Sequence, residues 1–425
     1  MNDTADTARD ALIDKLAREG RIRSPHVEAA FRAVPRHLFV PDAPLDQAYS
    51  DTHIVTKTVD GRDVSSSSQP TMMAIMLEQL DLRPGQRVLE IGAGTGYNAA
   101  LMAHIVGERG LVVTIDIDDD IVAAARAHLA AADYAHVRAL CGDGGLGYPD
   151  AAPYDRIIVT VGADDLPPAW RAQLRPGGRL VVPLGFTPLD TLRGSKVLVT
   201  FDRVDGYLES RAFSYCMFVP LRGAFGAAPV VPVALGPTPQ LDLITDGPVD
   251  ADRLYTALVG PHRDAAIGVM ASPRELWGLR LWLALHEPHF CDLYARGDCA
   301  AQGIVPFLSG WPGAVVATSG VCTAPTVALL TYEPGQVPTA DEPPDPDRSP
   351  ALMTRTFGPE GEAARGLAAR VIAWERAGKP FTFDDRWIIE GPRLRVYAKE
   401  ATYALSPHEA IIEKQSARLV FNWRS

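Results

Sequence analysis

From Leu82 onward, short runs of β-branched and other apolar residues alternate with alanine-rich stretches that have helical periodicity. The apolar runs are Arg87–Ile91, Leu111–Ile117, Val137–Leu140, Arg156–Val161, Arg179–Leu184 and Lys196–Phe201. Asn98–Val106 and Asp120–Ala131 have helical composition. This alternation predicts an α/β fold with a doubly wound, mostly parallel sheet. The runs near Lys196 and Arg211 have no helix between them, which predicts a reversed, antiparallel β-hairpin at one edge of the sheet.

The segment before this pattern is predicted to be helical and then irregular. Ala8, Leu12 and Leu16 recur at helical spacing. Ser24-Pro25 is typical of a helix N-terminus, and that helix should end before Pro35. Residues 51–70 are polar and contain four consecutive serines at 65–68. We interpret them as a long polar loop, which is unusual in a compact domain unless the loop has a function.

The composition changes after Gly223 to residues rich in proline, glycine and alanine. We therefore divide the chain into residues 1–80, an N-terminal helical and substrate-loop region, residues 81–223, the cofactor-binding core, and residues 224–425, an extension. The acidic, proline-rich stretch from Glu333 to Pro350 resembles a linker. One amphipathic helix (361–377) and short strand-like runs, such as Arg393–Ala398 and Arg418–Trp423, predict an α+β domain in the extension.

Composition excludes several classes of function. Forty-one basic and 52 acidic residues leave a net charge of −11, which argues against nucleic-acid or anionic-membrane binding. No apolar run approaches the roughly 18 residues that a membrane helix needs. Five dispersed cysteines indicate reduced thiols, and we expect a cytoplasmic protein. No metal site is predicted, because His286, His289 and Cys291 lack a second group of ligands at zinc-site spacing.

A glycine-rich turn follows the first predicted strand of the sheet, in the order Glu90-Ile91-Gly92-Ala93-Gly94-Thr95-Gly96-Tyr97. Glycines let a ligand approach the backbone, and the following helix offers free amide donors. Tyr97 stands where a dinucleotide fingerprint needs its last glycine. The acidic residue before a G-x-G-x-G turn matches methyltransferases that use S-adenosyl-L-methionine and release S-adenosyl-L-homocysteine. Two alternatives stay open: a tight turn without ligand, and a Glu90 that orders the loop through backbone amides.

Two further acidic residues follow predicted strands. Asp116 lies 20 residues after Gly96, at the spacing where such folds bind ribose hydroxyls. Asp143-Gly144 ends the next strand and suits an adenine amino group. Asp118, Asp119 and Asp120 are assigned to helix capping and to the first helical turn. The cofactor site is predicted to comprise Glu90, Gly92, Ala93, Gly94, Gly96, Asp116, Ile117, Asp143 and Gly144.

An ordered series of motifs resembles the protein-L-isoaspartate O-methyltransferase family over roughly residues 8–220. The series is Val34-Pro35-Arg36-His37-Leu38-Phe39-Val40-Pro41, Ala48-Tyr49-Ser50-Asp51, Ser68-Gln69-Pro70, the glycine turn, Gly142-Asp143-Gly144 and Leu174-Arg175-Pro176-Gly177-Gly178-Arg179-Leu180. The segment from Asp51 to Lys57 and the long extension depart from the repair enzymes. They look like the homologues that modify ribosomally made peptides such as lanthipeptides and graspetides. Val161-Gly162-Ala163 and Cys216-Met217-Phe218-Val219-Pro220-Leu221-Arg222-Gly223 support that likeness.

That resemblance implies methylation of an aspartate side chain in a ribosomally made precursor peptide that is already cyclised or constrained. Closure to aspartimide follows, in some cases with hydrolysis to isoaspartate. It places Ser68, with Ser66 beside it, at the acceptor carboxylate, where a hydroxyl can donate to one oxygen. Thr56, Lys57 and Gln69 are the predicted substrate contacts. The extension would recognise the peptide. A general isoaspartate repair enzyme and a binding module without catalysis are the alternatives.

Overall fold

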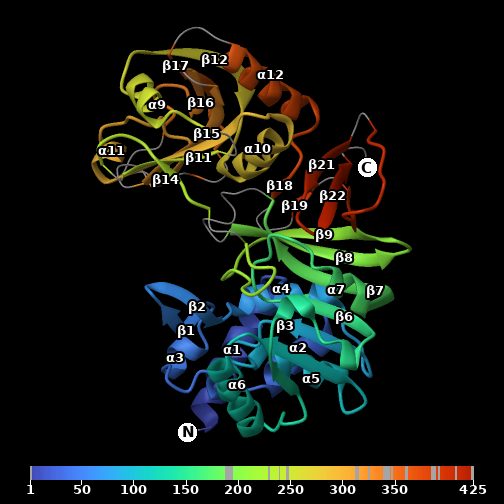
Figure 1. Ribbon diagram of the computed structural model, residues 1–425. Helices are drawn as coiled ribbons and strands as arrows, with labels where there is room; N and C mark the ends of the chain where they lie inside the picture. The colour runs from blue at the N-terminus through green and yellow to red at the C-terminus, as the bar shows by residue number, and fades with distance from the viewer. Residues whose placement is uncertain are drawn as a thin grey trace.

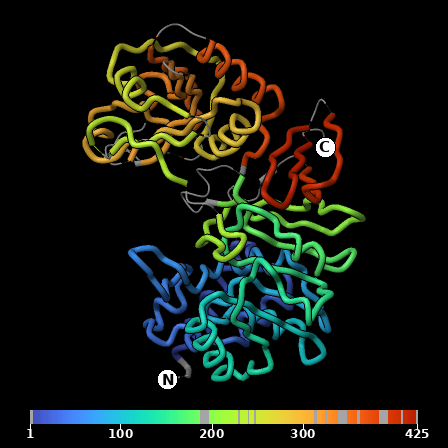
Figure 2. Tube along the Cα trace, viewed as in Figure 1, coloured from blue at the N-terminus to red at the C-terminus, as the bar shows by residue number. Residues whose placement is uncertain are grey.

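The computed structural model describes residues 2–186, 195–227, 230–238, 240–245, 248–311, 315–323, 326–337, 345, 348–358, 362–383, 389–390, 393–406 and 409–422. Part of the predicted linker from Glu333 to Pro350 lies outside these ranges, as does Trp423. The chain forms two bodies, a lower one from its first half and an upper one from most of its second half (Figures 1 and 2).

The lower body is built around a ten-stranded sheet. Its first seven strands in the chain are β3 (Arg87–Ile91), β4 (Leu111–Asp116), β5 (Arg138–Cys141), β6 (Tyr154–Val159), β7 (Leu174–Leu184), β8 (Ser195–Val204) and β9 (Tyr207–Met217). In space these strands follow the order β9-β8-β7-β6-β3-β4-β5. β3 to β7 are parallel, and β8 and β9 form an antiparallel hairpin at the end of the series. The predicted doubly wound sheet and its reversed edge are confirmed.

Helices cover this sheet and set up its carboxyl edge. They are α1 (Asn2–Arg18), α2 (Pro25–Ala33), α4 (Pro70–Leu80), α5 (Tyr97–Val106), α6 (Asp119–Ala131) and α7 (Pro168–Gln173), with short turns η1 (Arg36–Phe39), α3 (Leu45–Ala48), η2 (Gly144–Leu146) and η3 (Pro149–Ala151). Val34 is extended before Pro35, so α2 ends where the sequence predicts. Ser24 stands at the N-cap of α2, but its hydroxyl donates to the Glu78 carboxylate at 2.5 Å and does not cap the helix.

The polar loop predicted for residues 51–70 is wrong in its centre, where the chain forms a β-hairpin. β1 (Ile54–Val59) pairs antiparallel with β2 (Arg62–Ser67). Asp60 and Gly61 turn the chain with φ of 51° and 73°, the positive values that a two-residue hairpin turn requires. The Asp-Gly pair was therefore the signal for a hairpin, although the strands around it are rich in serine and threonine.

The predicted extension, residues 224–425, is divided between the two bodies. β20 (Arg393–Ala398) pairs with β9, and β22 (Ala417–Asn422) and β21 (Glu409–Glu413) continue the ten-stranded sheet beyond it. These strands lie beside β9 in Figure 1. Leu394 and Val396 are fully buried, so the last part of the chain completes the core of the first body.

The upper body is an α+β domain with an antiparallel sheet, as the sequence predicts. Its strands are β10 (Val233–Ala234), β11 (Leu241–Thr245), β12 (His262–Met270), β13 (Phe290–Arg296), β14 (Ser309–Trp311), β15 (Val315–Thr323), β16 (Thr326–Tyr332) and β17 (Ala351–Phe357). The helices are α9 (Ala251–Leu258), α10 (Pro273–His286), α11 (Gly297–Ala301) and α12 (Glu362–Arg376). The short pair β18 (Thr382–Phe383) and β19 (Ile389–Glu390) follows α12.

An aromatic cluster joins the two bodies. The Phe381 ring lies 6.3 Å from Phe213 of β9, 6.0 Å from Trp277 of α10 and 5.8 Å from Phe421 of β22, measured between ring centroids. Phe381 and Phe421 are both fully buried. Edge-to-face contacts of this kind add to the stabilisation that burial itself provides. The two bodies therefore share a continuous hydrophobic core.

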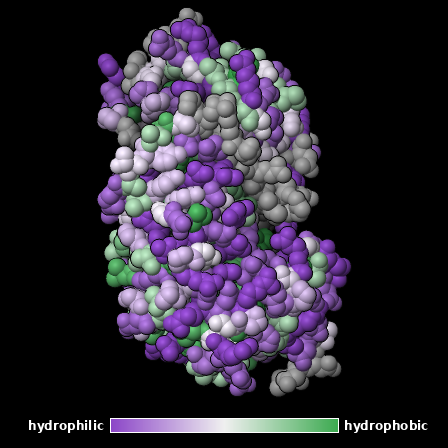
Figure 3. Space-filling model, turned by 90° about the vertical axis from the view of Figure 1, so that its right-hand side faces the viewer, coloured by the Kyte–Doolittle hydropathy of each residue, from purple (hydrophilic) through white to green (hydrophobic). Residues whose placement is uncertain are grey.

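No helix in the described ranges is long and apolar enough to cross a bilayer. The face shown in Figure 3 is mostly hydrophilic, with apolar residues scattered across it.

Candidate active site

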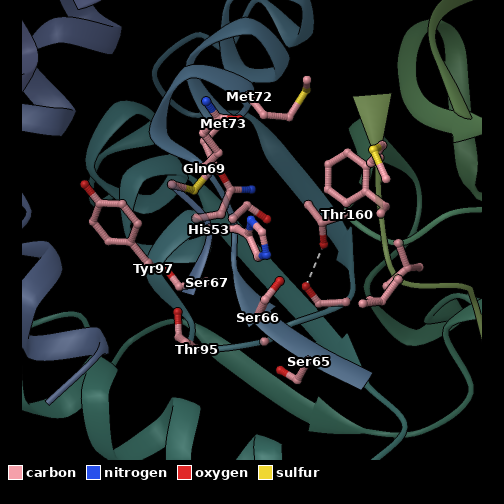
Figure 4. A pocket seen from close by; sticks show the side chains of 18 of the residues that line it. His53, Ser65, Ser66, Ser67, Gln69, Met72, Met73, Thr95, Tyr97 and Thr160 are labelled. Carbon is pink, nitrogen blue, oxygen red and sulfur yellow. Dashed lines mark hydrogen bonds between the residues drawn. The ribbon is translucent and has the colours of Figure 1, made fainter. Parts of the chain in front are cut away.

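A cavity of about 670 Å³ lies at the carboxyl edge of the parallel strands, between the sheet and the β1–β2 hairpin. One wall comes from the ends of β3, β4 and β6, and the opposite wall from β2 and α4. The end of β9 closes a third side. The predicted site residues that line the cavity are Ser66, Ser68, Gln69, Glu90, Gly92, Ala93, Gly94 and Asp116. Figure 4 shows the cavity from close by.

The glycine turn is held against the neighbouring strands by its own backbone. The Gly92 and Ala93 amides donate to the Ile115 carbonyl of β4, at 2.8 and 3.1 Å. Gly92, Gly94 and Gly96 have φ of 100°, 50° and 86°, in the region that side chains disfavour. A Cβ at Gly92 would lie 2.7 Å from Thr160 Oγ1, so glycine is also needed there for close packing. Gly96 caps α5 outside the cavity.

Glu90 is fully buried beneath this turn and is held by two side chains. Asn98 Nδ2 donates to Oε1 at 2.7 Å, and Thr114 Oγ1 donates to Oε2 at 2.6 Å. Both of these donors are side chains, so these contacts do not support the alternative in which Glu90 orders the loop through backbone amides. Burial raises the pKa of Glu90 to about 7, although both hydrogen bonds oppose the rise.

The acidic residues after the next two strands have different surroundings. Asp116 lines the cavity, and its Oδ2 accepts from the Gly94 amide at 3.1 Å. Asp143 does not line it: its carboxylate accepts from the Gly145 amide at 2.8 Å and the Ala224 amide at 2.7 Å. Ile117 and Gly144 also lie outside the cavity wall as the described residues form it. Adenine recognition by Asp143 stays a prediction, and in this structure the residues after β9 use that carboxylate.

The hydroxyls of Ser66, in β2, and of Ser68, just after β2, have no hydrogen-bond partner among the described residues, and both serines line the cavity. Ser65 and Ser67 are buried, and their hydroxyls accept from Thr56 Oγ1 at 3.0 Å and Arg36 Nη2 at 3.4 Å. Ser66 and Ser68 alternate with them and keep their hydroxyls available. The Ser66 carbonyl would lie 3.3 Å from a Cβ at Gly94, so the serine segment and the glycine turn are close neighbours.

The predicted substrate contacts divide into one residue inside the cavity and two outside it. Gln69 lines the cavity. Thr56 is engaged with Ser65, and Lys57 Nζ binds Asp118 Oδ2 at 3.0 Å and Asp120 Oδ1 at 2.8 Å. Roles for Thr56 and Lys57 in substrate binding stay predictions.

The expected helix capping by Asp118 is wrong. It stands at the N-cap of α6, but its side chain accepts no capping hydrogen bond. Arg222 and Lys57 bind the carboxylate instead, and they hold the pKa of Asp118 below its usual range. A nearby cation competes successfully with the helix amides for this carboxylate, which sequence spacing could not show. Asp119 and Asp120 do lie in the first turn of α6.

Sequence reasoning missed several residues at the cavity. Arg36, fully buried, donates to the carbonyls of Thr52 at 3.2 Å and Ser68 at 3.0 Å, and so fixes the serine segment. Thr160 bridges the Ile91 and Gly92 carbonyls at 2.9 and 2.7 Å. His53 lies in the middle of the cavity in Figure 4, between Gln69 and Ser66. Arg36 belongs to a quoted motif, but its role depends on contacts across the chain.

The cavity suits the predicted cofactor in the chemistry of its wall. Asp116 offers a carboxylate beside the glycine turn, where two hydroxyls could donate to it. Asn98 Oδ1 is buried at the cavity without a hydrogen-bond partner among the described residues, so it can accept a hydrogen bond from a bound ligand. Glu90 adds a potential negative charge at the cavity, which would suit the cationic end of that cofactor. The described residues contain no group of three or more potential metal ligands.

Comparisons with known proteins agree with this geometry. Residues 7–225, just over half of the chain, match the family model described as protein-L-isoaspartate(D-aspartate) O-methyltransferase. The protein-L-isoaspartate O-methyltransferase of Hyperthermus butylicus is 44% identical over 227 residues, which cover 52% of this chain and 90% of that protein. The enzyme of Methanopyrus kandleri is 42% identical over 220 residues, 52% of this chain and 93% of its own.

Two solved structures are also similar to the chain. A protein-L-isoaspartate O-methyltransferase, 25% identical, covers 91% of this chain and 96% of its own, with a TM-score of 0.49. A putative enzyme from Plasmodium falciparum in complex with S-adenosyl-L-homocysteine, 20% identical, covers 50% and 97%, with a TM-score of 0.42. The family model and the sequence relatives show that the chain belongs to the protein-L-isoaspartate O-methyltransferase family.

Proposed function

We propose that this protein is a carboxyl O-methyltransferase that esterifies an aspartate-derived side-chain carboxylate in a constrained precursor peptide. The observation that carries the proposal is that two serine hydroxyls, Ser66 and Ser68, line the same cavity as the glycine turn and have no partners in the described part of the chain. The family of this chain uses S-adenosylmethionine.

The residues of the cavity divide into a donor side and an acceptor side. On the donor side, Gly92, Gly94 and Asp116 would hold the cofactor, which supplies an electrophilic methyl group on a sulfonium. On the acceptor side, Ser68 would donate a hydrogen bond to one carboxylate oxygen and leave the other free. An aspartate carboxylate, with a reference pKa near 3.9, is ionised at neutral pH and needs no general base. The work of the protein is therefore to position the two reactants and exclude water.

The finer part of the proposal concerns the substrate and the product. The β1–β2 hairpin lies where the sequence departs from the repair enzymes that it resembles, and the upper body adds a domain beyond residue 225, where the family match ends. We propose that this domain recognises the precursor peptide. Esterification gives the carboxyl a better leaving group, so the next backbone nitrogen can attack and close a five-membered aspartimide, with loss of methanol.

General repair of isoaspartyl residues is the second candidate, because the relatives that match residues 7–225 are named protein-L-isoaspartate O-methyltransferases. The test incubates the protein and S-adenosylmethionine with two substrates, an isoaspartyl hexapeptide and the peptide encoded beside this gene. Mass spectrometry then reads a gain of about 14 Da for an ester, in which a methyl group replaces a hydrogen, or a net loss of about 18 Da for an imide, in which water is lost overall. Faster reaction of the hexapeptide would favour repair. Reaction of neither would contradict carboxyl methylation.

Ser68→Ala is expected to lower the turnover number about 10- to 100-fold, because a hydrogen bond to a charged group contributes roughly 1.5–3 kcal/mol. The affinity for S-adenosylmethionine should stay within a few-fold, since Ser68 lies on the acceptor side. Initial rates and calorimetric titration measure the two quantities. Ser50→Ala is the control, because that hydroxyl donates to the Gln47 carbonyl outside the cavity. Unchanged turnover in Ser68→Ala would remove Ser68 from the reaction.

Cofactor affinity is expected to increase between pH 6 and pH 8. The pKa of Glu90 is raised to about 7, so the carboxyl loses its proton in this range and gains attraction for a sulfonium. The same raised pKa gives stability to the unliganded fold at low pH, and that contribution is lost as pH rises from about 4.5 through 7. Calorimetry at several pH values measures the affinity.

S-adenosyl-L-homocysteine is the matched ligand, because it lacks only the methyl group and its positive charge. The affinity for S-adenosyl-L-homocysteine should change less with pH than the affinity for S-adenosylmethionine. In Glu90→Gln the two affinities should have the same pH dependence. Equal pH dependence of both ligands in the wild type would show that Glu90 does not sense the sulfonium.

We also propose that the reaction takes place in the cytoplasm, as the sequence predicts. All five cysteines have free thiols in the structure, which suits a reducing compartment.

A further inference from the structure

His53 and Ser68 flank the same end of the β1–β2 hairpin. Ile54 and Ser67 form the last pair of the ladder there, His53 immediately precedes Ile54, and Ser68 immediately follows Ser67. Ile54 and Ser67 are buried, at 7% and 3% exposed. Both His53 and Ser68, by contrast, are at least partly exposed, and both line the cavity.

The buried guanidinium of Arg36 connects the backbone just before His53 to the backbone of Ser68. Nη2 of Arg36 donates to the carbonyl of Thr52, immediately before His53, and to the carbonyl of Ser68. Nη1 of the same guanidinium binds the carbonyls of Ala48 and Ser50. The backbone at both positions is therefore fixed before any substrate arrives, which is the condition for precise orientation of a ligand.

His53 differs in charge type from the other ionisable side chains that line the cavity. Asp63, Glu90 and Asp116 line it, and in the described part of the chain no lysine or arginine does. The nearby cations are engaged elsewhere: Lys57 with Asp118 and Asp120, and Arg222 with Asp118. A carboxylate acceptor that enters this cavity meets three acidic side chains, and among the described lining residues only His53 can carry a positive charge.

We propose that His53 and Ser68 together bind the acceptor carboxylate, and that His53 makes the site selective for an anionic acceptor over its neutral amide. This inference rests on the proposed carboxyl methylation and adds the residue that recognises the charge. The imidazole donates a hydrogen bond to the same carboxylate that Ser68 contacts, and a positively charged ring adds attraction. The second carboxylate oxygen stays free to accept the methyl group.

The test measures the Michaelis constant and turnover number of the wild type, His53→Ala and His53→Gln with whichever of the two peptides above the wild type methylates faster. His53→Ala should raise the acceptor Michaelis constant about tenfold or more, with the turnover number within about threefold. His53→Gln keeps a donor and should recover part of the loss. His136→Gln is the control, because that exposed ring lies beside Tyr134 and outside the cavity.

Charge recognition has its own measurement. For the wild type, the inhibition constant of a competing peptide with asparagine at the target position should be much larger than the Michaelis constant of the acceptor peptide. In His53→Ala the ratio of these two constants should be smaller. If the wild type is active and His53→Ala has the same Michaelis constant and the same discrimination between the acceptor and the asparagine peptide, the role of His53 is wrong. The proposed carboxyl methylation would still stand. A wild type that methylates neither peptide would overturn the proposed function and this inference with it.

Discussion

Removal of residues 393–425 is expected to prevent the protein from folding stably, although this segment lies far along the chain from the cavity. The deletion removes β20, β22 and β21 and leaves β9 as an exposed edge. Leu394, Val396, Leu419 and Phe421 are fully buried. At roughly 1.5–3 kcal/mol for each buried side chain, their loss approaches the ~5–15 kcal/mol that stabilises a typical protein. An unpaired edge also promotes aggregation.

The same segment supports the third side of the cavity, which the end of β9 and the residues after it form. The Ser416 amide donates to Asp165 Oδ2 at 2.7 Å, and Lys414 Nζ donates to the Gly185 carbonyl at 2.8 Å. The Gly185 amide donates to the Ala163 carbonyl at 2.8 Å, and the Gly162 amide to Val219, a cavity residue, also at 2.8 Å. The tip of the β21–β22 hairpin thus braces the loop behind the cavity wall.

Soluble yield and thermal unfolding, followed by circular dichroism, measure the effect of the deletion. Glu413→Gln is the matched control on the same hairpin, because Glu413 forms only exposed ion pairs with Lys399 and Arg418 in the described structure. It should unfold within a few degrees of the wild type. A deleted chain that unfolds cooperatively at the wild-type temperature would contradict the shared core. Truncation after Gly223 removes these strands too, so loss of activity in that variant would not identify a peptide-recognition domain.

Gly92→Ala is expected to weaken S-adenosylmethionine binding about 100-fold or more. A Cβ at this position would lie 2.7 Å from Thr160 Oγ1 and 3.0 Å from Val161 Cγ1, both on the cavity wall. The φ of 100° adds strain of about 1–3 kcal/mol for any other residue. The turn can relieve the contact only by moving into the space of the cofactor or by breaking the bridge from Thr160.

Gly177→Ala separates these two causes. Gly177 has a φ of 69°, but nothing lies within 4 Å of the position that a Cβ would take there, so the variant carries backbone strain without a steric contact. Both variants should lose some thermal stability, and only Gly92→Ala should lose cofactor affinity in calorimetric titration. Equal affinities in the two variants would show that the close packing at Gly92 does not shape the cofactor site.

The sheet of the first body was predictable because its signals are local. β3 occupies the predicted range Arg87–Ile91, and α5 and α6 begin within one residue of the predicted starts. A strand buried on both faces needs a continuous apolar run, and glycines with positive φ are needed where the chain turns toward a ligand. The cofactor follows from the same kind of signal, and membership of the family supports it.

The β1–β2 hairpin and the acceptor side of the cavity were harder to predict from the sequence. Serine and threonine are polar, so β1 and β2 lack the apolar alternation that marks a strand, and only Asp60-Gly61 indicated the turn. Asp143 and Asp118 were assigned to ligand and cap from their positions after strands. In the structure these carboxylates accept hydrogen bonds from the Ala224 amide and from Arg222, which follow them in the chain by 81 and 104 residues.

The sequence by itself determined the parallel sheet, its reversed edge, the glycine turn and the family, because each depends on residues close together in the chain. The tertiary structure alone decided that residues 393–422 complete the first body, that Arg36 fixes the serine segment, and that His53 and Ser68 line the same cavity. Such contacts depend on which distant surfaces the hydrophobic core brings together. Local preference carries no information about those pairings, since the same strand or side chain could satisfy several partners equally well.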